Sequence, residues 1–261
     1  MTSSGARAMA TCAQTNLQLY NQLYDAGWSA ADLAAARTVY ELDVQLFAGR
    51  FRPNGKPFVA HLVGVASLVE RFGLPPATVL AALAHAAYAQ GNFADSPGGR
   101  CAERRARVRA AAGTEAERIA ESYDRYKQGA GMAEAAGRLR LGKEIDETER
   151  QVLAIDLANT LEEYLDYGHL YSRKLEVRTE AGFQQQNSVQ LAQLLGLPVL
   201  AQELEAAGAL TASAQRPPEL VTDQVQSFTV AGRSSHPARW LLRRIAGRLR
   251  RLLAPVISSP A

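Results

Sequence analysis

Two histidines lie 24 residues apart in a stretch that is otherwise almost entirely apolar. His61 and His85 belong to the segment 55–93, where apolar residues at helical spacing predict two helices. The second, from about Pro76 to Ala89, is apolar on nearly every side and should be buried. A buried imidazole needs a hydrogen-bond partner, a counter-charge or a metal ion. His61 and His85 are therefore the first candidates for a functional site.

Tyr88 follows His85 by one turn of the expected helix. In an apolar pocket, His61, His85 and Tyr88 would supply a general base, a general acid and an oxyanion donor without a metal ion. Burial lowers the pKa of a histidine, so both imidazoles would stay neutral and able to accept a proton. Elimination, isomerisation or cyclisation of a small molecule would suit such a site, but no residue names the substrate.

Three cations precede the first of these helices, namely Arg50, Arg52 and Lys56. Guanidinium and ammonium groups so placed could hold an anionic ligand at the entrance of a site. A solvated loop has the same composition, so both interpretations stay open.

A later helix, expected from about Asp146 to Asp166, offers two further polar side chains. Asn159 lies at the edge of its apolar face, and Glu163 is one turn further on. An amide in this position is either a hydrogen-bonded structural group or a ligand for a bound molecule. Asn159 and Glu163 therefore join the candidate ligand-binding residues.

The chain resembles the HD-domain superfamily, most closely the hydrolase domain of RelA/SpoT-type proteins and a less characterised group of bacterial HD-like proteins. The likeness rests on Gly55-Lys-Pro-Phe-Val-Ala-His61, on His85 and on Leu157-Ala-Asn159, and it covers roughly residues 45–165. It implies an all-α fold, a divalent transition metal held in part by His61 and His85, and hydrolysis of a nucleotide or another phosphate ester.

The sequence departs from the superfamily at the metal-binding carboxylates. Ala86 and Asn159 stand where the family has aspartates. Two imidazoles and an amide fall short of a catalytic metal site, which usually has about three protein ligands including a carboxylate. Asp156, Glu162 or Glu163 could replace the missing ligands only if their helix rotated or shifted. We therefore expect no cofactor, and a divalent transition metal is the alternative that the resemblance keeps open.

Three functions remain in view. The first is a small-molecule pocket that binds or regulates without hydrolysis, because the carboxylates have been lost. The second is a metal-free acid–base enzyme that uses His61 and His85 on a small metabolite. The third is a residual metal-dependent hydrolase of nucleotides or phosphate esters.

Helical spacing recurs along most of the chain, so we expect an all-α protein, and the resemblance implies a single HD-like helical bundle. Thr114 and Glu117 should form a capping box at the start of one helix. Ser227–Ala231 has the composition of a strand but is too short and isolated to predict a sheet. The expected divisions are a disordered N-terminal tail at 1–15, the bundle at 16–210, a flexible linker at 211–238 and a basic amphipathic helix at 239–257.

Basic charge is concentrated at the C-terminal end. Residues 231–261 carry seven Arg and no acidic residue, whereas residues 1–230 have 22 basic and 26 acidic side chains. The alternation of apolar and basic residues predicts contact with an anionic membrane surface or an acidic partner. Nucleic acid is less favoured, because the globular part has no basic excess. The residues expected to make the contact are Trp240, Arg243, Arg244, Arg248, Arg250 and Arg251.

Cellular location is bounded by what the sequence lacks. No apolar run reaches the roughly 18 to 20 residues that a spanning helix needs, and the first residues have no apolar core of the secretory kind. Cys12 and Cys101 give neither a disulfide framework nor metal-ligand spacing. We expect a cytoplasmic protein that can associate peripherally with a membrane through its tail.

Overall fold

The computed structural model describes residues 12–94, 99–172 and 175–230, without the side chains of residues 175–184. The chain divides into two units, Met1–Phe228 and Thr229–Ala261, and the description below concerns the first. The basic residues of the C-terminal segment, from Trp240 to Arg251, lie outside the described residues.

Helices dominate the first unit, which confirms the all-α prediction. In chain order the elements are α1 (Asn16–Asp25), α2 (Ala30–Leu46), β1 (Arg50–Phe51), α3 (Phe58–Arg71), α4 (Pro76–Ala84), α5 (Ala87–Gln90), α6 (Ala102–Ala112), α7 (Thr114–Gln128), α8 (Gly131–Arg140), α9 (Glu147–Leu165), the 3-10 turn η1 (Gly168–Tyr171), α10 (Leu175–Leu194), α11 (Pro198–Ser213), the 3-10 turn η2 (Pro218–Leu220) and β2 (Phe228–Thr229).

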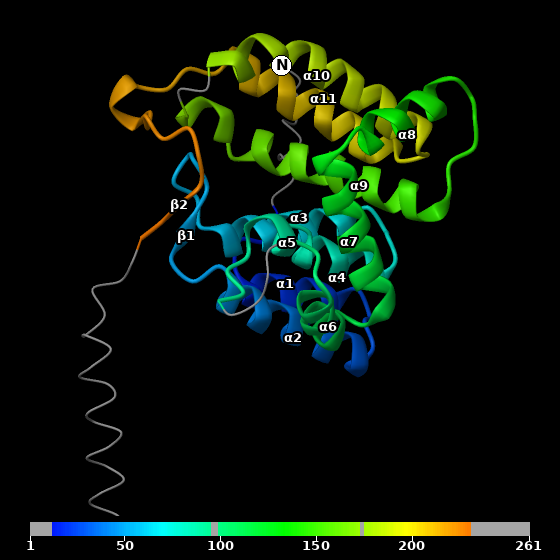
Figure 1. Cartoon of the computed structure of the whole chain (residues 1–261). Coiled ribbons are helices and arrows are strands. Elements are labelled where there is room, and N and C mark those ends of the chain that lie inside the picture. Colours follow the sequence, from blue (N-terminus) through cyan, green and yellow to red (C-terminus); the bar gives the residue numbers. More distant parts are fainter. Residues whose placement is uncertain (1–11, 95–98, 173–174, 231–261) are drawn as a thin grey trace, which may run out of the picture. The chain divides into compact units, whose positions relative to one another are not determined.

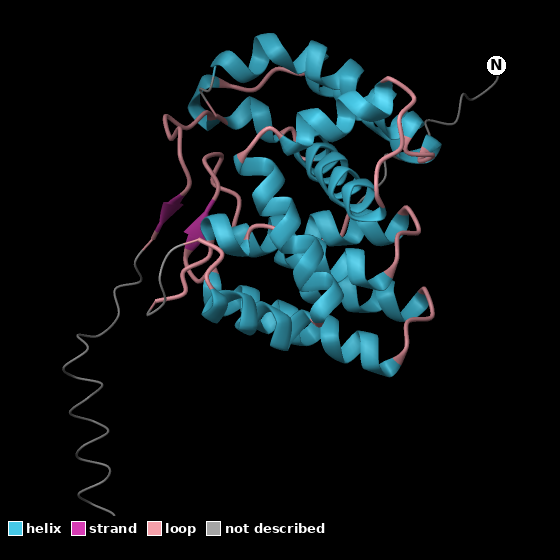
Figure 2. Cartoon of the chain, turned by 45° about the vertical axis from the view of Figure 1, so that its right-hand side comes forward, coloured by secondary structure: helices cyan, strands magenta, loops and turns pink. Residues whose placement is uncertain are grey.

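The core forms where α3, α4, α7 and α9 meet (Figures 1 and 2). Leu62 and Leu68 of α3, Leu83 of α4 and Ile155 of α9 are fully buried. Burial of each such side chain contributes about 1.5 to 3 kcal/mol. α11 packs on α9 and α10 packs on α11, while α2 packs on α4 and α6. The apolar faces of α3, α4 and α9 thus hold the two histidines and the acidic face of α9 close together.

The helix expected from Pro76 to Ala89 is interrupted, so this prediction was wrong in its extent. α4 ends at Ala84, and Ala86 has φ −94° and ψ 0° before the single turn of α5. Nδ1 of His85 lies 2.7 Å from the carbonyl oxygen of Ala82. The side chain of His85 therefore bonds to the last turn of α4 and stands at the end of that helix.

The expected capping box at the start of α7 is absent. Gly113, with φ +85°, precedes the helix, and Thr114 is its first residue without a side-chain cap. Glu117 is 1% exposed and accepts hydrogen bonds from Arg105 and Arg109 of α6. Charged partners on a neighbouring helix thus hold the carboxylate that a local cap would have used.

Residues 12–15 lie against α3, although the sequence places them in a tail. The N–H of Ala13 donates to Oγ of Ser67 (2.9 Å). Thr15 caps α1 by accepting from the N–H of Gln18, whose side chain bonds back to the N–H of Thr15. Residues 12–15 therefore cover one side of α3.

Residues 214–228, which we call the strap, run from the end of α11 to β1. The guanidinium of Arg216 lies over the ring of Tyr167, with 4.3 Å to its centroid. The N–H of Thr222 donates to the carbonyl of Tyr171 (3.0 Å). The first half of the strap is therefore fixed to η1, within the stretch that the sequence predicts as a linker.

The second half of the strap ends beside β1. β1 and β2 form a two-stranded sheet, and the rings of Phe51 and Phe228 are stacked with centroids 5.5 Å apart. The segment with the composition of a strand does contain one, β2. Its partner strand, β1, lies about 175 residues earlier in the chain, so no local pattern reveals the pairing.

Within the described part of the chain, no helix combines the length and the apolar content that crossing a bilayer would require.

Candidate functional site

A tight turn between β1 and α3 positions Arg52 and Lys56. The N–H of Arg52 donates to the carbonyl of Lys56 (2.8 Å), and the N–H of Gly55 donates to the carbonyl of Arg52 (2.9 Å). Gly55 has φ +86°, a conformation that favours glycine. The turn brings both cations to the acidic face of α9, where Lys56 pairs with Glu162 and Arg52 pairs with Glu163.

His61 and Glu162 form the buried centre of the site. Nδ1 of His61 lies 2.7 Å from Oε2 of Glu162, and the two residues are 2% and 1% exposed. Burial alone would raise the pKa of Glu162, but His61 and Lys56 lower it to about 2. The carboxylate is therefore ionised and can only accept, so Nδ1 of His61 carries the proton and donates it.

Gly64 makes this contact sterically feasible. It lies one turn after His61 on α3, and a Cβ at this position would stand 2.9 Å from Cγ and 3.0 Å from Oε1 of Glu162. Contacts below 3.0 Å force one group to move. The missing side chain thus lets the carboxylate of Glu162 lie directly on α3.

Arg52 is the second group in contact with His61. Its Nη1 lies 2.7 Å from Nδ1 and 3.2 Å from Nε2 of His61, and 3.7 Å from Oε2 of Glu162. With the Nδ1 proton directed to Glu162, only Nε2 can accept from the guanidinium, although Nη1 lies nearer to Nδ1 in a contact between two donors. Burial and the charge of Arg52 lower the pKa of His61. The imidazole is consequently neutral, with both nitrogens engaged.

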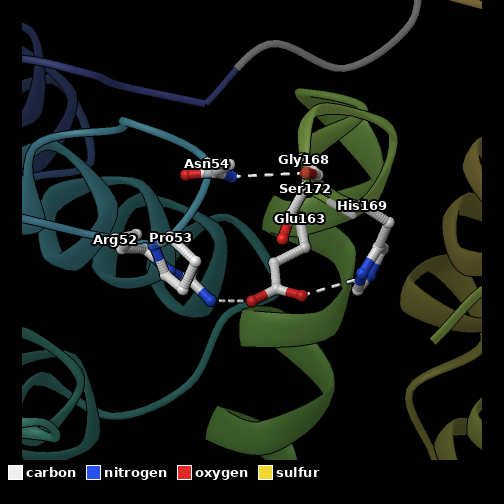
Figure 3. A pocket seen from close by; sticks show the side chains of 7 residues that line it. All are labelled: Arg52, Pro53, Asn54, Glu163, Gly168, His169 and Ser172. Carbon is white, nitrogen blue, oxygen red and sulfur yellow. Dashed lines mark hydrogen bonds and ion pairs between the residues drawn. The ribbon is translucent and has the colours of Figure 1, made fainter. Parts of the chain in front are cut away.

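An open pocket of about 170 Å³ begins at Arg52. Figure 3 shows the guanidinium of Arg52 in contact with the carboxylate of Glu163. Oε2 of the same carboxylate lies 3.1 Å from Nε2 of His169. Burial and the charge of Arg52 lower the pKa of His169, so its neutral imidazole donates to the carboxylate. The lining residues are Arg52, Pro53, Asn54, Glu163, Gly168, His169 and Ser172.

The two walls of the pocket approach each other at Asn54 and Gly168. Nδ2 of Asn54 lies 3.5 Å from the carbonyl of Gly168, and a Cβ on Gly168 would stand 2.8 Å from that nitrogen. Tyr167, with φ +55°, turns the chain from α9 into η1. His169 and Ser172 were missed by the sequence reasoning, and only the pairing of Gly168 with a following histidine could have drawn attention to them.

His85 lies beside His61, with ring centroids 5.4 Å apart, and its other face neighbour is Tyr123 at 5.1 Å. Since a carbonyl only accepts, the bond to Ala82 places the proton of His85 on Nδ1. Within the described residues, Nε2 of His85 makes no hydrogen bond. Burial and the neighbouring His61 lower the pKa of His85 to about 3.

Two of the sequence-predicted residues lie outside this cluster. The hydroxyl of Tyr88 donates to Oε1 of Glu117 (2.9 Å), and burial raises its pKa. Arg50 donates to Oε1 of Gln90 (2.6 Å) and stacks on the ring of Phe58. The structure thus gathers His61, His85, Arg52, Lys56 and Glu163, but it gives Tyr88 and Arg50 other partners.

Asn159 stands between Asp156 and Glu163 on the same face of α9 and is partly exposed. Asp156 accepts from the hydroxyl of Tyr123 (3.1 Å) and from Lys127 (2.5 Å). Within the described residues, the side chain of Asn159 forms no hydrogen bond. Its amide is therefore available at the edge of the cluster.

The donors do not fit the metal ion that the HD resemblance implies. Among the described residues, no three His, Cys, Asp or Glu side chains converge as metal ligands would. The acceptor nitrogen of His61 faces Arg52, and the carboxylates of Glu162 and Glu163 already contact cations. The positive charge of Arg52 lies beside His61 and Glu163, which a divalent ion would need as ligands, and would repel such an ion.

Comparison with known proteins gives one finding. Residues 44–126 match a family described as a domain of unknown function, DUF6817. The matched segment contains Arg52, His61 and His85 but ends before α9, and it covers less than half of the chain. The match provides no link to the HD superfamily, and no curated protein matches the chain.

Proposed function

We propose that this protein binds a small polar molecule in the pocket beside Arg52 and does not hydrolyse it. The observation that supports the proposal is the partly buried guanidinium of Arg52, which contacts His61 and pairs with Glu163 at the pocket's edge. Pockets for drug-sized ligands measure about 300 to 1,000 Å³, so a cavity of about 170 Å³ suits a compact metabolite.

The HD-superfamily likeness belongs to the same proposal. The histidines keep the superfamily spacing, and the chain supplies its own cation, Arg52, next to His61. An arginine carries a permanent single charge and donates hydrogen bonds without activating water as a metal ion does. We infer a descendant that has kept the scaffold and exchanged hydrolysis for recognition.

An acid–base enzyme built on the histidines is less well supported. A general base works best when its pKa lies near the working pH, whereas His85 has a pKa of about 3. The accepting nitrogen of His61 is occupied by Arg52. These two facts favour binding over proton transfer.

The test screens the full-length protein against compact polar metabolites by thermal shift and ligand-detected NMR, with and without manganese. Binding should be saturable, weakened at least tenfold by Arg52→Ala, and unaccompanied by turnover. Arg71→Ala removes a surface ion pair with Glu203 instead and should leave binding intact. Manganese-dependent phosphate release that is lost in His61→Ala would overturn the proposal in favour of a hydrolase.

A further inference from the structure

The charged groups of the pocket are already paired with each other. Arg52 and Glu163 are the ionised residues of its lining, and their side chains are in contact (Figure 3). His169 is neutral and donates to the free oxygen of Glu163. The lining therefore presents one positive and one negative charge side by side, with no net charge to attract a simple ion.

The surrounding residues do not change this balance in favour of anions. Lys56 pairs with Glu162 and Asp166, so these three groups together add one negative charge. The sequence predicted an anionic ligand at Arg50, Arg52 and Lys56, but each cation has an acceptor or aromatic partner in the protein. An anion that bound Arg52 would separate it from Glu163 and leave that partly buried carboxylate without its cation, which is unfavourable.

A ligand with two opposite charges avoids this cost. Its carboxylate can replace Glu163 at the guanidinium, while its ammonium group can replace Arg52 at the carboxylate. Every charge then has an opposite partner before and after binding, as electrostatic complementarity requires. Asn54 and Ser172 at the rim offer neutral hydrogen-bonding groups for the rest of the molecule.

We propose that the pocket between Arg52 and Glu163 recognises a small zwitterion that carries an ammonium and a carboxylate group a few bonds apart. This inference rests on the proposed binding function and names its ligand class. The ligand must be compact, because the pocket measures about 170 Å³, and open-chain amino acids meet that condition.

The experiment titrates the full-length protein by calorimetry and saturation-transfer NMR with a spacing series of glycine, β-alanine, 4-aminobutyrate and 5-aminovalerate. Acetate and methylammonium serve as the singly charged halves. At least one zwitterion should bind about tenfold or more tightly than either half. Glu163→Gln preserves the shape of the side chain and should remove that advantage, whereas Glu203→Gln, outside the pocket, should retain it.

The outcomes separate this inference from the proposed function. If acetate or methylammonium binds as tightly as every zwitterion, in a manner lost in Glu163→Gln or Arg52→Lys, the ligand class is wrong and the pocket function stands. If no zwitterion, ion or neutral metabolite binds in a way that depends on Arg52 or Glu163, both are overturned. An advantage for zwitterions that survives Glu163→Gln would place the binding elsewhere and also contradict the inference.

Discussion

The guanidinium of Arg52 carries a permanent positive charge beside His61. This charge makes protonation of the His61 imidazole less favourable. It lies beside His61 and among Glu162 and Glu163, so it stabilises two carboxylates and at the same time keeps an imidazole neutral. The side chain of Arg52 therefore keeps His61 neutral and also lines the pocket. Its removal should have separable effects on stability and on histidine titration.

We expect Arg52→Ala to reduce the free energy of unfolding by about 1 to 3 kcal/mol, because the partly buried Glu163 loses its cation while Glu162 keeps Lys56. The pKa of His61 should rise, since the guanidinium lowers it in the parent. Urea unfolding and NMR titration of the imidazole would measure the two effects. Arg37→Ala, in an exposed pair with Glu41, should change stability little. An unaltered His61 titration would contradict the assigned contact.

Asp43 presents the opposite case, a buried carboxyl group without a hydrogen-bond partner among the described residues. Burial raises its pKa well above the ordinary value, so the folded state holds its proton more tightly than the unfolded state. The contribution of Asp43 to stability is therefore most favourable below the unfolded pKa of about 3.9. It declines as pH rises toward the folded pKa.

Asp43→Asn removes this titration. The variant should gain stability over the parent at neutral pH, and the difference should shrink as pH falls toward about 4 and level off below it, where Asp43 is protonated in both states. Chemical unfolding at a series of pH values would measure it, with the exposed Asp25→Asn as control. A difference that stays constant across the series would show that the pKa of Asp43 is the same in the folded and unfolded states.

Helix packing explains why the site depends on close contact between α3 and α9. Glu162 reaches His61 only because Gly64 lacks a side chain. Gly64→Ala should destabilise the fold by about 1 to 3 kcal/mol through overpacking and should break the bond between His61 and Glu162. Thermal unfolding and the chemical shift of Nδ1–H in His61 would report both.

Gly137→Ala is the matched control for that substitution. Gly137 also lies within a helix, α8, but a Cβ there would meet no atom within 4 Å. Because alanine favours helices over glycine by roughly 0.5 to 1 kcal/mol, this variant should be neutral or slightly more stable. Equal destabilisation of both variants would indicate a helix effect rather than the contact with Glu162.

Local sequence patterns predicted elements whose form depends on their own residues. The helix expected from about Asp146 to Asp166 is α9, which spans Glu147–Leu165 and has a capping box at Asp146. Local patterns did not predict features that depend on contacts with residues distant in the sequence. The break after α4 lies in an alanine-rich run with no breaking residue, and Glu117 left its expected cap for arginines of α6.

The candidate site shows the same division. The histidines stand out because imidazoles are rare in apolar helices, Arg52 was found because it precedes the helix of His61, and Glu163 because it follows Asn159 by one turn. The ion pairs that decide their chemistry join residues 106 and 111 positions apart, and His169 lies on a 3-10 turn with no periodicity of its own. Pair geometry of this kind arises only from the packing of α9 on α3.

At the scale of the whole molecule, the basic C-terminal segment is the part whose role rests on composition alone. We propose that its seven Arg, with no acidic residue among them, contact an anionic membrane surface, where each Arg near the surface is worth about 1 kcal/mol; an acidic partner is the alternative that the same composition allows. Deletion of residues 236–261 should leave the thermal midpoint nearly unchanged and remove binding to anionic liposomes.

Two controls sharpen this prediction. Neutral phosphatidylcholine liposomes should bind neither the full-length protein nor the deletion variant. Replacement of three arginines by Gln in the full-length protein should weaken binding to anionic liposomes in proportion to the lost charge. A cooperative loss of stability after the deletion would instead mean that the segment packs on the helical unit. The residues for the triple replacement are Arg243, Arg244 and Arg248.

The two walls of the pocket have different origins along the chain, and the strap fastens both. One wall, residues 52–54, lies within the segment that matches DUF6817, but the other, residues 163–172, and the strap lie beyond it. A recombination event that transferred only residues 44–126 to another gene would carry both histidines and no pocket. The proposed binding site therefore depends on residues up to Phe228, and we expect that a gene fusion must include them to retain the proposed binding.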